Sequence, residues 1–252
     1  MELAGKVALV TGGSGTLGGL ICRELCNAGV HVAVGYASGK EKSMAVAQEL
    51  TSSGHRAISV ACDVTDDSQV EAAVNSTASE LGRLDILVND GAYNKSIPFE
   101  DLDTMFDEWQ QIMDINLTGP MRMVKAASKV MRLSSEGGRI VNISSVAGLT
   151  AGGSSVAYAV SKAGLNHLTR CLARALAPDI LVNCIAPGYL EGTLMSERLT
   201  EQHRQRSVNE SLLQKAASKE DIARQTVEFC RTDTVTGQTL VIDSGRELHS
   251  DF

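Results

Sequence analysis

The sequence has little that points to nucleic acid or to a membrane. Its formal net charge is −7, and no apolar run approaches the roughly 18 residues that a membrane-spanning helix needs. An acidic chain is repelled by phosphate backbones and by anionic lipid surfaces, so we expect neither as a partner. The N-terminus also lacks the basic region and cleavage site of a secretory leader, so we expect no secretion.

Cysteine is present, but without the spacing of a metal site. The six thiols are scattered and stand mostly in apolar surroundings: Cys22, Cys26, Cys62, Cys171, Cys184 and Cys230. We therefore expect no metal ion and a reduced, cytoplasmic protein.

What the chain does contain is a regular alternation of apolar strands with helical patterns. Its 252 residues, 43% of them hydrophobic, are enough for one compact domain with a sizeable core. Helical patterns, including a long one over 109–131, separate the predicted strands, which are 6–11, 30–34, 57–61, 84–89, 138–144, 180–185 and 239–243. This alternation predicts an α/β, single-domain Rossmann fold over residues 1–252. Its core would be a doubly wound seven-stranded parallel sheet with helices on both faces.

A glycine-rich loop lies between the first predicted strand and its helix. Gly13, Gly15 and Gly18 fit the pattern G-x-G-x-x-G in the context that a dinucleotide fingerprint requires. Small residues let the backbone approach a pyrophosphate, and the helix N-terminus supplies N–H groups and partial positive charge. A turn without a ligand explains three such glycines less well. The cofactor contacts predicted here are Gly12, Ser14, Gly15, Thr16, Leu17 and Gly18.

The end of the second predicted strand indicates which dinucleotide is bound. An acid there, about 20 residues past the first glycine, would hold a ribose 2′-hydroxyl and repel a 2′-phosphate. The stretch from Tyr36 to Lys40 contains no acid, and Ser38 and Lys40 are available to a phosphate. We therefore predict NADP(H) rather than NAD(H), with Tyr36, Ser38 and Lys40 among its contacts.

Tyr158 and Lys162 are four residues apart, on one face of a predicted helix. A phenol, with a normal pKa near about 10, is a poor acid or base at neutral pH. We expect the nearby ammonium to lower the pKa of Tyr158 and so suit it to proton transfer at a hydroxyl or carbonyl. Ser145, at the end of a predicted strand, is available to hold the substrate oxygen. The alternative for such a pair is a solvated helix face.

Together with further motifs in the same order, these features resemble the classical short-chain dehydrogenase/reductase family over nearly the whole chain. The further motifs are Cys62-Asp63-Val64, Val88-Asn89, Asp114-Ile115-Asn116, Ala186-Pro187-Gly188 and Thr236-Gly237-Gln238. The resemblance implies oxidation of alcohols or reduction of carbonyls with a nicotinamide cofactor by a homo-oligomer, either a dimer or a tetramer.

The resemblance also implies roles for individual residues. Tyr158 would exchange the proton, Ser145 would orient the carbonyl, Lys162 would also hold the nicotinamide ribose, and Asn116 would anchor a water leading from Lys162 to solvent. The implied cofactor contacts elsewhere are Asp63, Val64, Asn89, Gly91, Pro187, Gly188 and Thr193. A helix kink at Asn116, a turn cap at Asp63 and an ordinary loop residue at Thr193 are the alternatives.

The chain departs from the family pattern beside the cofactor. Where the family usually has Asn-Asn-Ala-Gly, this sequence has Asn89-Asp90-Gly91-Ala92, which places an unusual carboxylate at Asp90. In the glycine loop, Thr16 stands where a glycine is usual. We expect these changes to reshape the ribose pocket and to alter pyrophosphate affinity. They motivate an alternative function, a dinucleotide-binding scaffold or sensor that has lost turnover.

Within the family the chain most resembles the 3-oxoacyl-[acyl-carrier-protein] reductases, which dock an acidic carrier protein through basic residues near the catalytic cleft. The corresponding places hold Glu136 and Asp179, and like charges disfavour such an encounter. We therefore expect a free small-molecule ketone or secondary alcohol rather than a carrier-bound thioester. A substrate lid is expected over 189–217, with four candidates for an apolar wall and three basic residues: Leu190, Leu194, Met195, Leu199, His203, Arg204 and Arg206. The basic residues either meet an anionic substrate or belong to a solvated face of the lid helix.

The leading hypothesis is an NADP(H)-dependent oxidoreductase that interconverts a ketone and a secondary alcohol by hydride transfer, with Tyr158 as acid or base. Such an enzyme is a short-chain alcohol dehydrogenase or carbonyl reductase of class EC 1.1.1. The alternatives are the scaffold, a 3-oxoacyl-thioester reductase, and a relative that uses the same pocket for non-redox isomerisation or cyclisation.

Overall fold

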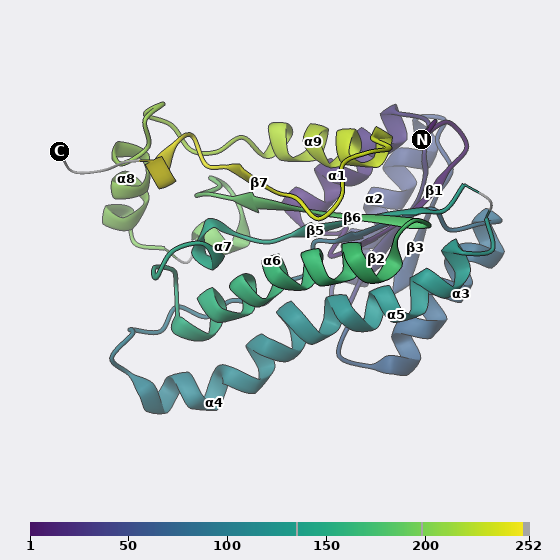
Figure 1. Ribbon diagram of the computed structural model, residues 1–252. Coiled ribbons are helices and arrows are strands. Elements are labelled where there is room, and N and C mark those ends of the chain that lie inside the picture. Colours follow the sequence, from purple (N-terminus) through teal and green to yellow (C-terminus); the bar gives the residue numbers. More distant parts are fainter. Residues whose placement is uncertain (135, 198, 249–252) are drawn as a thin grey trace.

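The centre of the molecule is a parallel sheet of seven strands in the order β3-β2-β1-β4-β5-β6-β7 (Figure 1). The computed structural model describes residues 1–134, 136–197 and 199–248, without the side chains of Met195 and His203. The strands are β1 (Val7–Thr11), β2 (His31–Tyr36), β3 (Ala57–Ala61), β4 (Ile86–Asn89), β5 (Gly138–Ile143), β6 (Ile180–Pro187) and β7 (Thr239–Ile242). The order and the parallel pairing confirm the predicted doubly wound Rossmann architecture.

Helices cover both faces of the sheet, above and below it in Figure 1. One layer holds α1 (Thr16–Asn27), α2 (Lys40–Ser52) and α9 (Lys219–Arg231), and the other holds α3 (Asp67–Leu81), α5 (Gly119–Met131) and α6 (Val156–Leu176). Because side chains alternate along a strand, Ala8 and Val10 enter the first core and Val7 and Leu9 enter the second. Burial on both faces explains why the strands are continuous apolar runs.

The long helical pattern predicted over 109–131 is helical in the structure, but its predicted start is wrong. The structure has α4 (Leu102–Met113), a π-helical turn η1 (Asp114–Thr118) and then α5. The first helix begins seven residues before Trp109 because the Asp101 carboxylate accepts the N–H of Thr104 and caps the first turn. The π turn adds a residue to the helical ladder, and Asn116 is its buried residue.

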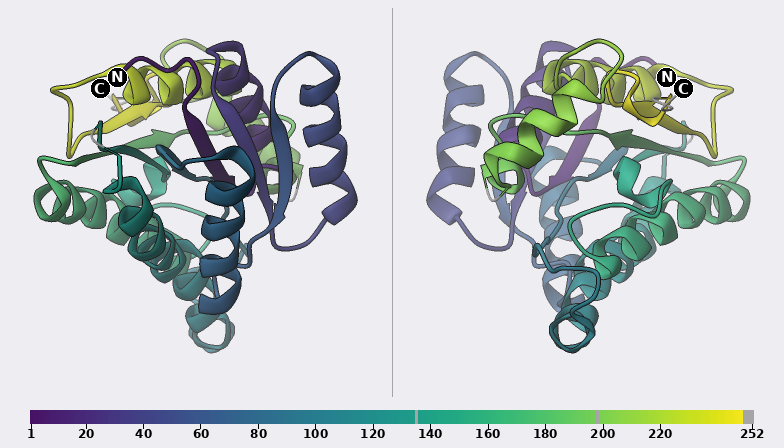
Figure 2. Two further views of the ribbon diagram at one scale, coloured as in Figure 1. Left: turned by 90° about the vertical axis from the view of Figure 1, so that its right-hand side faces the viewer. Right: turned by 90° about the vertical axis from the view of Figure 1, so that its left-hand side faces the viewer.

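Short helices complete the carboxyl edge of the sheet, where Thr11, Asn89, Asn142 and Cys184 stand level on neighbouring strands. They are the 3-10 turn η2 (Val146–Gly148), α7 (Leu194–Glu197), α8 (Glu201–Asn209) and the 3-10 turn η3 (Arg246–Leu248). In the right-hand view of Figure 2, α8 lies in front of this edge. Among the described residues, no helix has both the length and the apolar character that crossing a bilayer requires.

Candidate active site

A cavity of about 900 Å³ lies at the carboxyl edge of the sheet. The segments that follow β1, β2, β3, β4, β5 and β6 all contribute to its wall. The strand order reverses between β1 and β4, because successive strands are added on one side of β1 up to β3 and on its other side from β4 onward. This is the topological switch point at which open α/β sheets place their ligands. The cavity is therefore where the fold predicts a bound dinucleotide.

The glycine loop forms one end of this cavity with backbone alone. Gly12 has a φ of +66°, and a Cβ on it would lie 2.9 Å from the backbone of Gly91. A Cβ on Gly18 would lie 2.3 Å from the carbonyl oxygen of Gly12. Gly15 caps α1 without a side-chain hydrogen bond, so N–H groups of the first helical turn are left for a ligand. This cradle fits a pyrophosphate.

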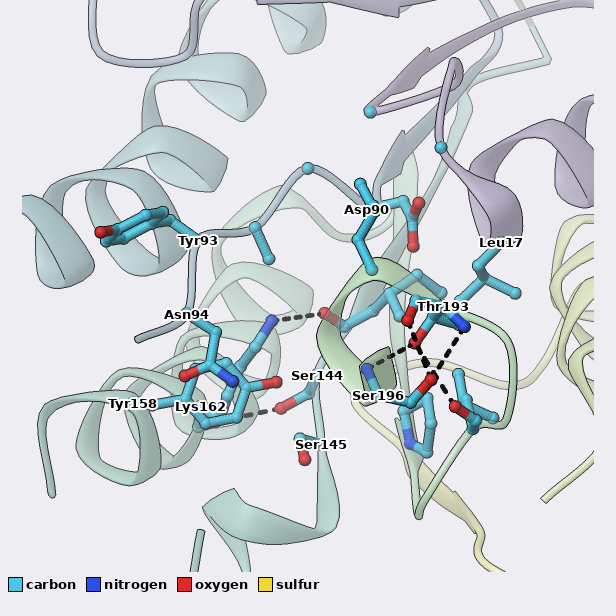
Figure 3. A pocket seen from close by; sticks show the side chains of 18 of the residues that line it. Leu17, Asp90, Tyr93, Asn94, Ser144, Ser145, Tyr158, Lys162, Thr193 and Ser196 are labelled. Carbon is cyan, nitrogen blue, oxygen red and sulfur yellow. Dashed lines mark hydrogen bonds between the residues drawn. The ribbon is translucent and has the colours of Figure 1, made fainter. Parts of the chain in front are cut away.

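Tyr158 and Ser145 face one another across the other end of the cavity. Tyr158 lies in the first turn of α6, whose N-cap Ser155 accepts the Tyr158 N–H at 3.2 Å. The Ser145 side chain hydrogen-bonds Tyr158 and also accepts the N–H of Ala147 at 3.1 Å. Ser144, by contrast, donates to the carbonyl oxygen of Lys162 at 3.1 Å (Figure 3). The structure thus brings Ser145, rather than its neighbour, to the phenol.

Lys162 is buried one turn further along α6. Its Nζ donates to the carbonyl oxygen of Ile143 at 2.9 Å and lies 5.7 Å from the centre of the Tyr158 ring. Burial lowers the pKa of Lys162 to about 8, partly offset by the negative charge of Asp90 and by Cys184. A positive charge held this deep acts on its neighbours through little intervening water.

The expected net lowering of the Tyr158 pKa by Lys162 is not found in this arrangement. Burial is the main cause that raises the pKa of Tyr158 to about 12; the hydrogen bond from Ser145 opposes the rise, and the charge of Asp90 adds a smaller part of it. The physical reason is that the phenol is only 8% exposed, so the loss of hydration outweighs a lysine whose Nζ is directed to Ile143. At neutral pH, Tyr158 is therefore a protonated donor.

Asn116 is buried beneath the loop that follows β4, outside the cavity lining. Its Oδ1 accepts the N–H of Tyr93 at 2.8 Å, and its Nδ2 donates to the carbonyl oxygen of Tyr93 at 2.9 Å and to Ser161 at 3.1 Å. The side chain therefore ties the β4 loop to α6. Its place in the π turn agrees with the helix-kink alternative.

Most of the predicted cofactor contacts do line the cavity. These are Gly12, Ser14, Gly15, Thr16, Leu17, Tyr36, Ser38, Asp63, Val64, Gly91, Tyr158, Lys162, Pro187, Gly188 and Thr193. Asp63 also caps a turn, since its Oδ1 accepts the N–H of Thr65 at 2.9 Å. Thr193 accepts the N–H of Ser196 at 3.2 Å at the start of α7.

Three predicted cofactor contacts lie outside the lining. Gly18 lies behind the loop, where its closeness to Gly12 shapes the cradle. Lys40 opens α2, but the lysine that lines the cavity is Lys42, two residues on. Asn89 is buried and donates to Asn142 at 2.8 Å, while its own Oδ1 has no hydrogen-bond partner. Its side chain therefore belongs to the sheet interior rather than to the adenosine wall.

Sequence reasoning missed a second group of lining residues. They are Lys42, Tyr93, Asn94, Tyr189, Asp243, Arg246 and Glu247. The last three come from the segment after β7, which carries no motif and reaches the cavity only because β7 pairs with β6. Lys42 had a signal, since it is a basic residue close behind the second strand. Within the described part of the chain, no three His, Cys, Asp or Glu side chains are placed to hold a metal ion.

The segment over 189–217 borders the cavity through three of its predicted wall residues, Leu190, Leu194 and Leu199. The side chains of Met195 and His203 lie outside the described structure. Arg204 donates to the carbonyl oxygen of Leu199 at 3.0 Å, and Arg206 is paired with Glu210. Neither of these arginines lines the cavity, so the expectation that they meet an anionic substrate is not supported. Arg246 does line it and donates to Glu210 at 2.8 Å.

Glu136 and Asp179 do not lie near the cleft of this chain, contrary to expectation. Glu136 precedes β5 and Asp179 precedes β6, so both stand at the amino edge of the sheet, opposite the cavity. Glu136 is paired with Lys6, and Asp179 lies 3.4 Å from Arg132. Their charges therefore do not repel a carrier at the cavity mouth.

The fold and the cavity together define an open-sheet protein with a dinucleotide cradle beside a serine, tyrosine and lysine cluster. Residues 6–204 match the family model of the short chain dehydrogenases. The chain therefore belongs to the short-chain dehydrogenase family. It is an oxidoreductase of this family, and the family binds a nicotinamide dinucleotide.

Relatives match over nearly the full length of the chain. A 3-oxoacyl-[acyl-carrier-protein] reductase of Synechocystis sp. is 34% identical and is covered over 97% of its length by 96% of this chain. The enzyme of the same name from Staphylococcus aureus is 33% identical, with 95% of this chain and 97% of the relative covered. Among solved structures, a short-chain type dehydrogenase/reductase from Mycobacterium marinum superposes with a TM-score of 0.87 at 29% identity, covering 97% of this chain and 96% of that one.

Proposed function

We propose that this chain is an NADP(H)-dependent oxidoreductase that interconverts a ketone and a secondary alcohol. The observation that carries the proposal is the meeting of Tyr158, Ser145 and Lys162 at one end of a cavity whose other end is a bare glycine cradle. When bound, the nicotinamide supplies the hydride. The protein then has to provide a proton, an oriented carbonyl and a dry site.

The three side chains divide this work. A carbonyl oxygen placed between Ser145 and Tyr158 accepts hydrogen bonds from both hydroxyls, which orients it and favours developing negative charge. Tyr158, protonated at neutral pH, donates its proton to that oxygen. Lys162 places a positive charge behind the phenol, where it favours the phenolate that remains. Asn116 is a positioning residue, because it fixes the loop carrying Tyr93 against α6.

The preference for NADP(H) rests on the rim of the cavity after β2. Tyr36, Ser38 and Lys42 line it there, and no acid stands between Tyr36 and Gly39. A 2′-phosphate at this place meets a hydroxyl and an ammonium rather than a carboxylate.

Replacing Lys42 by Ala is expected to lower kcat/KM for NADPH about tenfold and to change kcat/KM for NADH little. A hydrogen bond to a charged group contributes about 1.5–3 kcal/mol, and about 1.4 kcal/mol corresponds to a factor of ten. Steady-state rates with both cofactors measure the ratio. Lys40→Ala is the matched comparison, since Lys40 lies outside the lining. An equal loss in both variants, or a wild-type preference for NADH, would contradict the assignment.

Two substrate classes remain under the proposal. The apolar wall from Leu190, Leu194 and Leu199 suits a free ketone with an apolar substituent. A 3-oxoacyl thioester is the second candidate, supported by the names of the two curated relatives and by the distance of Glu136 and Asp179 from the cavity.

A substrate panel separates these classes and tests the function. NADPH oxidation is followed at the nicotinamide absorbance with small ketones, with a 3-oxoacyl thioester of a short thiol, and with the same acyl group on a carrier protein. We expect turnover of at least one free carbonyl substrate. Tight NADPH binding with no turnover on any member would favour the scaffold instead.

The organisation of the chain completes the proposal. We take residues 1–252 as one dinucleotide-binding and catalytic domain in which 189–217 acts as a lid over the substrate end. A homo-oligomer, dimer or tetramer, is supported by apolar side chains exposed on and beside α4, namely Phe99, Leu102 and Phe106.

A further inference from the structure

Asp90 is a carboxylate placed inside the proposed cofactor site, directly after β4. Its backbone N–H donates to the Thr11 hydroxyl at 3.2 Å, and the next N–H, from Gly91, donates to the same oxygen at 3.1 Å. The side chain lines the cavity and is half-buried. Figure 3 shows it between Leu17 of α1 and Lys162 of α6.

The carboxylate is bound at the start of α1. It accepts the backbone N–H of Gly18, and a Cβ on Gly18 would lie 2.9 Å from its Oδ2. The helix end attracts negative charge, but it is also the place where the pyrophosphate of a dinucleotide is expected. Side chain and ligand therefore share one set of N–H groups and one region of positive potential.

The surroundings provide one opposite charge for Asp90. The titratable and charged groups that face it are Cys22 on α1, and Tyr158 and Lys162 on α6. Of these, Lys162 stabilises the carboxylate, as does the Gly18 N–H, but burial outweighs both and raises the pKa of Asp90 to about 7. The carboxyl is thus divided between its two protonation states near neutral pH.

We propose that Asp90 is a positioning residue that couples dinucleotide binding to the uptake of one proton from solvent onto its carboxyl group. A pyrophosphate at the cradle adds negative charge beside the carboxylate, and two like charges in a buried site disfavour each other. The neutral acid keeps a carbonyl oxygen for the Gly18 N–H, so protonation removes the repulsion without releasing the loop. This inference rests on the proposed cofactor site.

The direction of the effect follows from linkage. A bound dinucleotide raises the pKa of Asp90 above its value of about 7 in the free protein. Affinity is therefore greatest below that pH, where the carboxyl is neutral in both states. It falls by up to about tenfold per pH unit as pH rises from the free to the bound pKa.

Isothermal titration of the protein with NADH and with NADPH tests the proposal by binding rather than turnover. NADH is the sharper probe because it lacks the 2′-phosphate, whose own second ionisation lies near pH 6. We expect the Kd for NADH to rise about tenfold between pH 6.5 and 8.5 in the wild type. Titrations at pH 8 in buffers of different ionisation enthalpy should show close to one proton taken up per NADH.

Asp90→Asn is the decisive variant because the amide keeps the acceptor for Gly18 but has no charge. We expect most of the rise in Kd and most of the proton uptake to be lost, leaving only the part that Lys162 contributes above its pKa of about 8. Asp90→Ala, which also loses the acceptor, should bind more weakly than Asp90→Asn at every pH and show the same small pH dependence. Asp63→Asn, at a carboxylate of the same cavity, should retain the wild-type slope.

The outcomes distinguish this inference from the proposed function. A wild-type Kd that does not change with pH, or an Asp90→Asn protein that still takes up the proton, would overturn the role of Asp90 alone. Absence of NADH and NADPH binding by the folded wild type would instead overturn the proposed cofactor. Thermal unfolding of each variant confirms that the proteins compared are folded.

Discussion

Replacing Tyr158 by Phe is expected to lower kcat/KM for ketone reduction about 10²- to 10⁴-fold, the range over which a positioned proton donor contributes. The phenol is the group that hydrogen-bonds Ser145, and its high pKa keeps it protonated at neutral pH. The substitution removes the proton and one of two hydrogen bonds to the substrate oxygen. Steady-state rates with saturating NADPH measure the loss.

The change should leave the fold intact. The ring packs in a buried cluster with Ile112 and Ala157, and Phe keeps these contacts. The Kd of Tyr158→Phe for NADPH should stay within a few-fold of the wild-type value, because the hydride comes from the nicotinamide and only the proton comes from Tyr158. Tyr93→Phe is the matched comparison, since Tyr93 lines the same cavity but its hydroxyl donates to Glu108 at 3.2 Å. The decrease in kcat/KM for Tyr93→Phe should be much smaller than for Tyr158→Phe. Full activity in Tyr158→Phe would contradict the mechanism.

Replacing Lys162 by Met is expected to lower kcat/KM by about 10²-fold or more, on the scale of one preorganised electrostatic contact in a buried site. Met has a similar length and fills the space of a side chain that is 2% exposed. What is lost is the positive charge behind Tyr158 and the hydrogen bond to Ile143. Without Lys162, the pKa of Asp90 should also rise, because the lysine is the opposite charge that lowers it.

The pH dependence separates a charge effect from a packing effect at Lys162. The pKa of the buried lysine is lowered to about 8, so its charge is present below that pH and is lost above it. Wild-type kcat/KM should therefore decline as pH rises through about 8. Lys162→Arg keeps its charge throughout this range and should lose that decline while retaining more activity than Lys162→Met. A decline near pH 8 that persists in Lys162→Arg would assign it to another group.

The strand pattern and the glycine loop could be predicted from the sequence because each depends on residues that are close together in the chain. Continuous apolar runs occur where both faces of a sheet are covered, and glycines occur where a Cβ has no room, as at Gly12 and Gly18. The start of α4 was misjudged, although Asp101 is a capping residue of a common kind.

The tyrosines show the limit of reading the site from sequence. All four, Tyr36, Tyr93, Tyr158 and Tyr189, line the cavity. Tyr36 also has a lysine four residues on, Lys40, but only Tyr158 has its lysine on the same helix, α6. Tyr36 ends β2, where it was predicted as a cofactor contact. Tyr93 and Tyr189 reach the cavity from the segments after β4 and β6, and no motif beside them indicates that.

The sequence by itself determined the fold class, the glycine cradle and the pairing of Tyr158 with Lys162, because each depends on residues close together in the chain. The tertiary structure alone decided which groups share the cavity and in what charge state. It placed Lys42 rather than Lys40 at the rim, moved Glu136 and Asp179 to the opposite edge of the sheet, and enclosed Asp90 with Lys162. The reason is physical, since burial and the distances between charges on different strands set a pKa, and neither is encoded in local spacing.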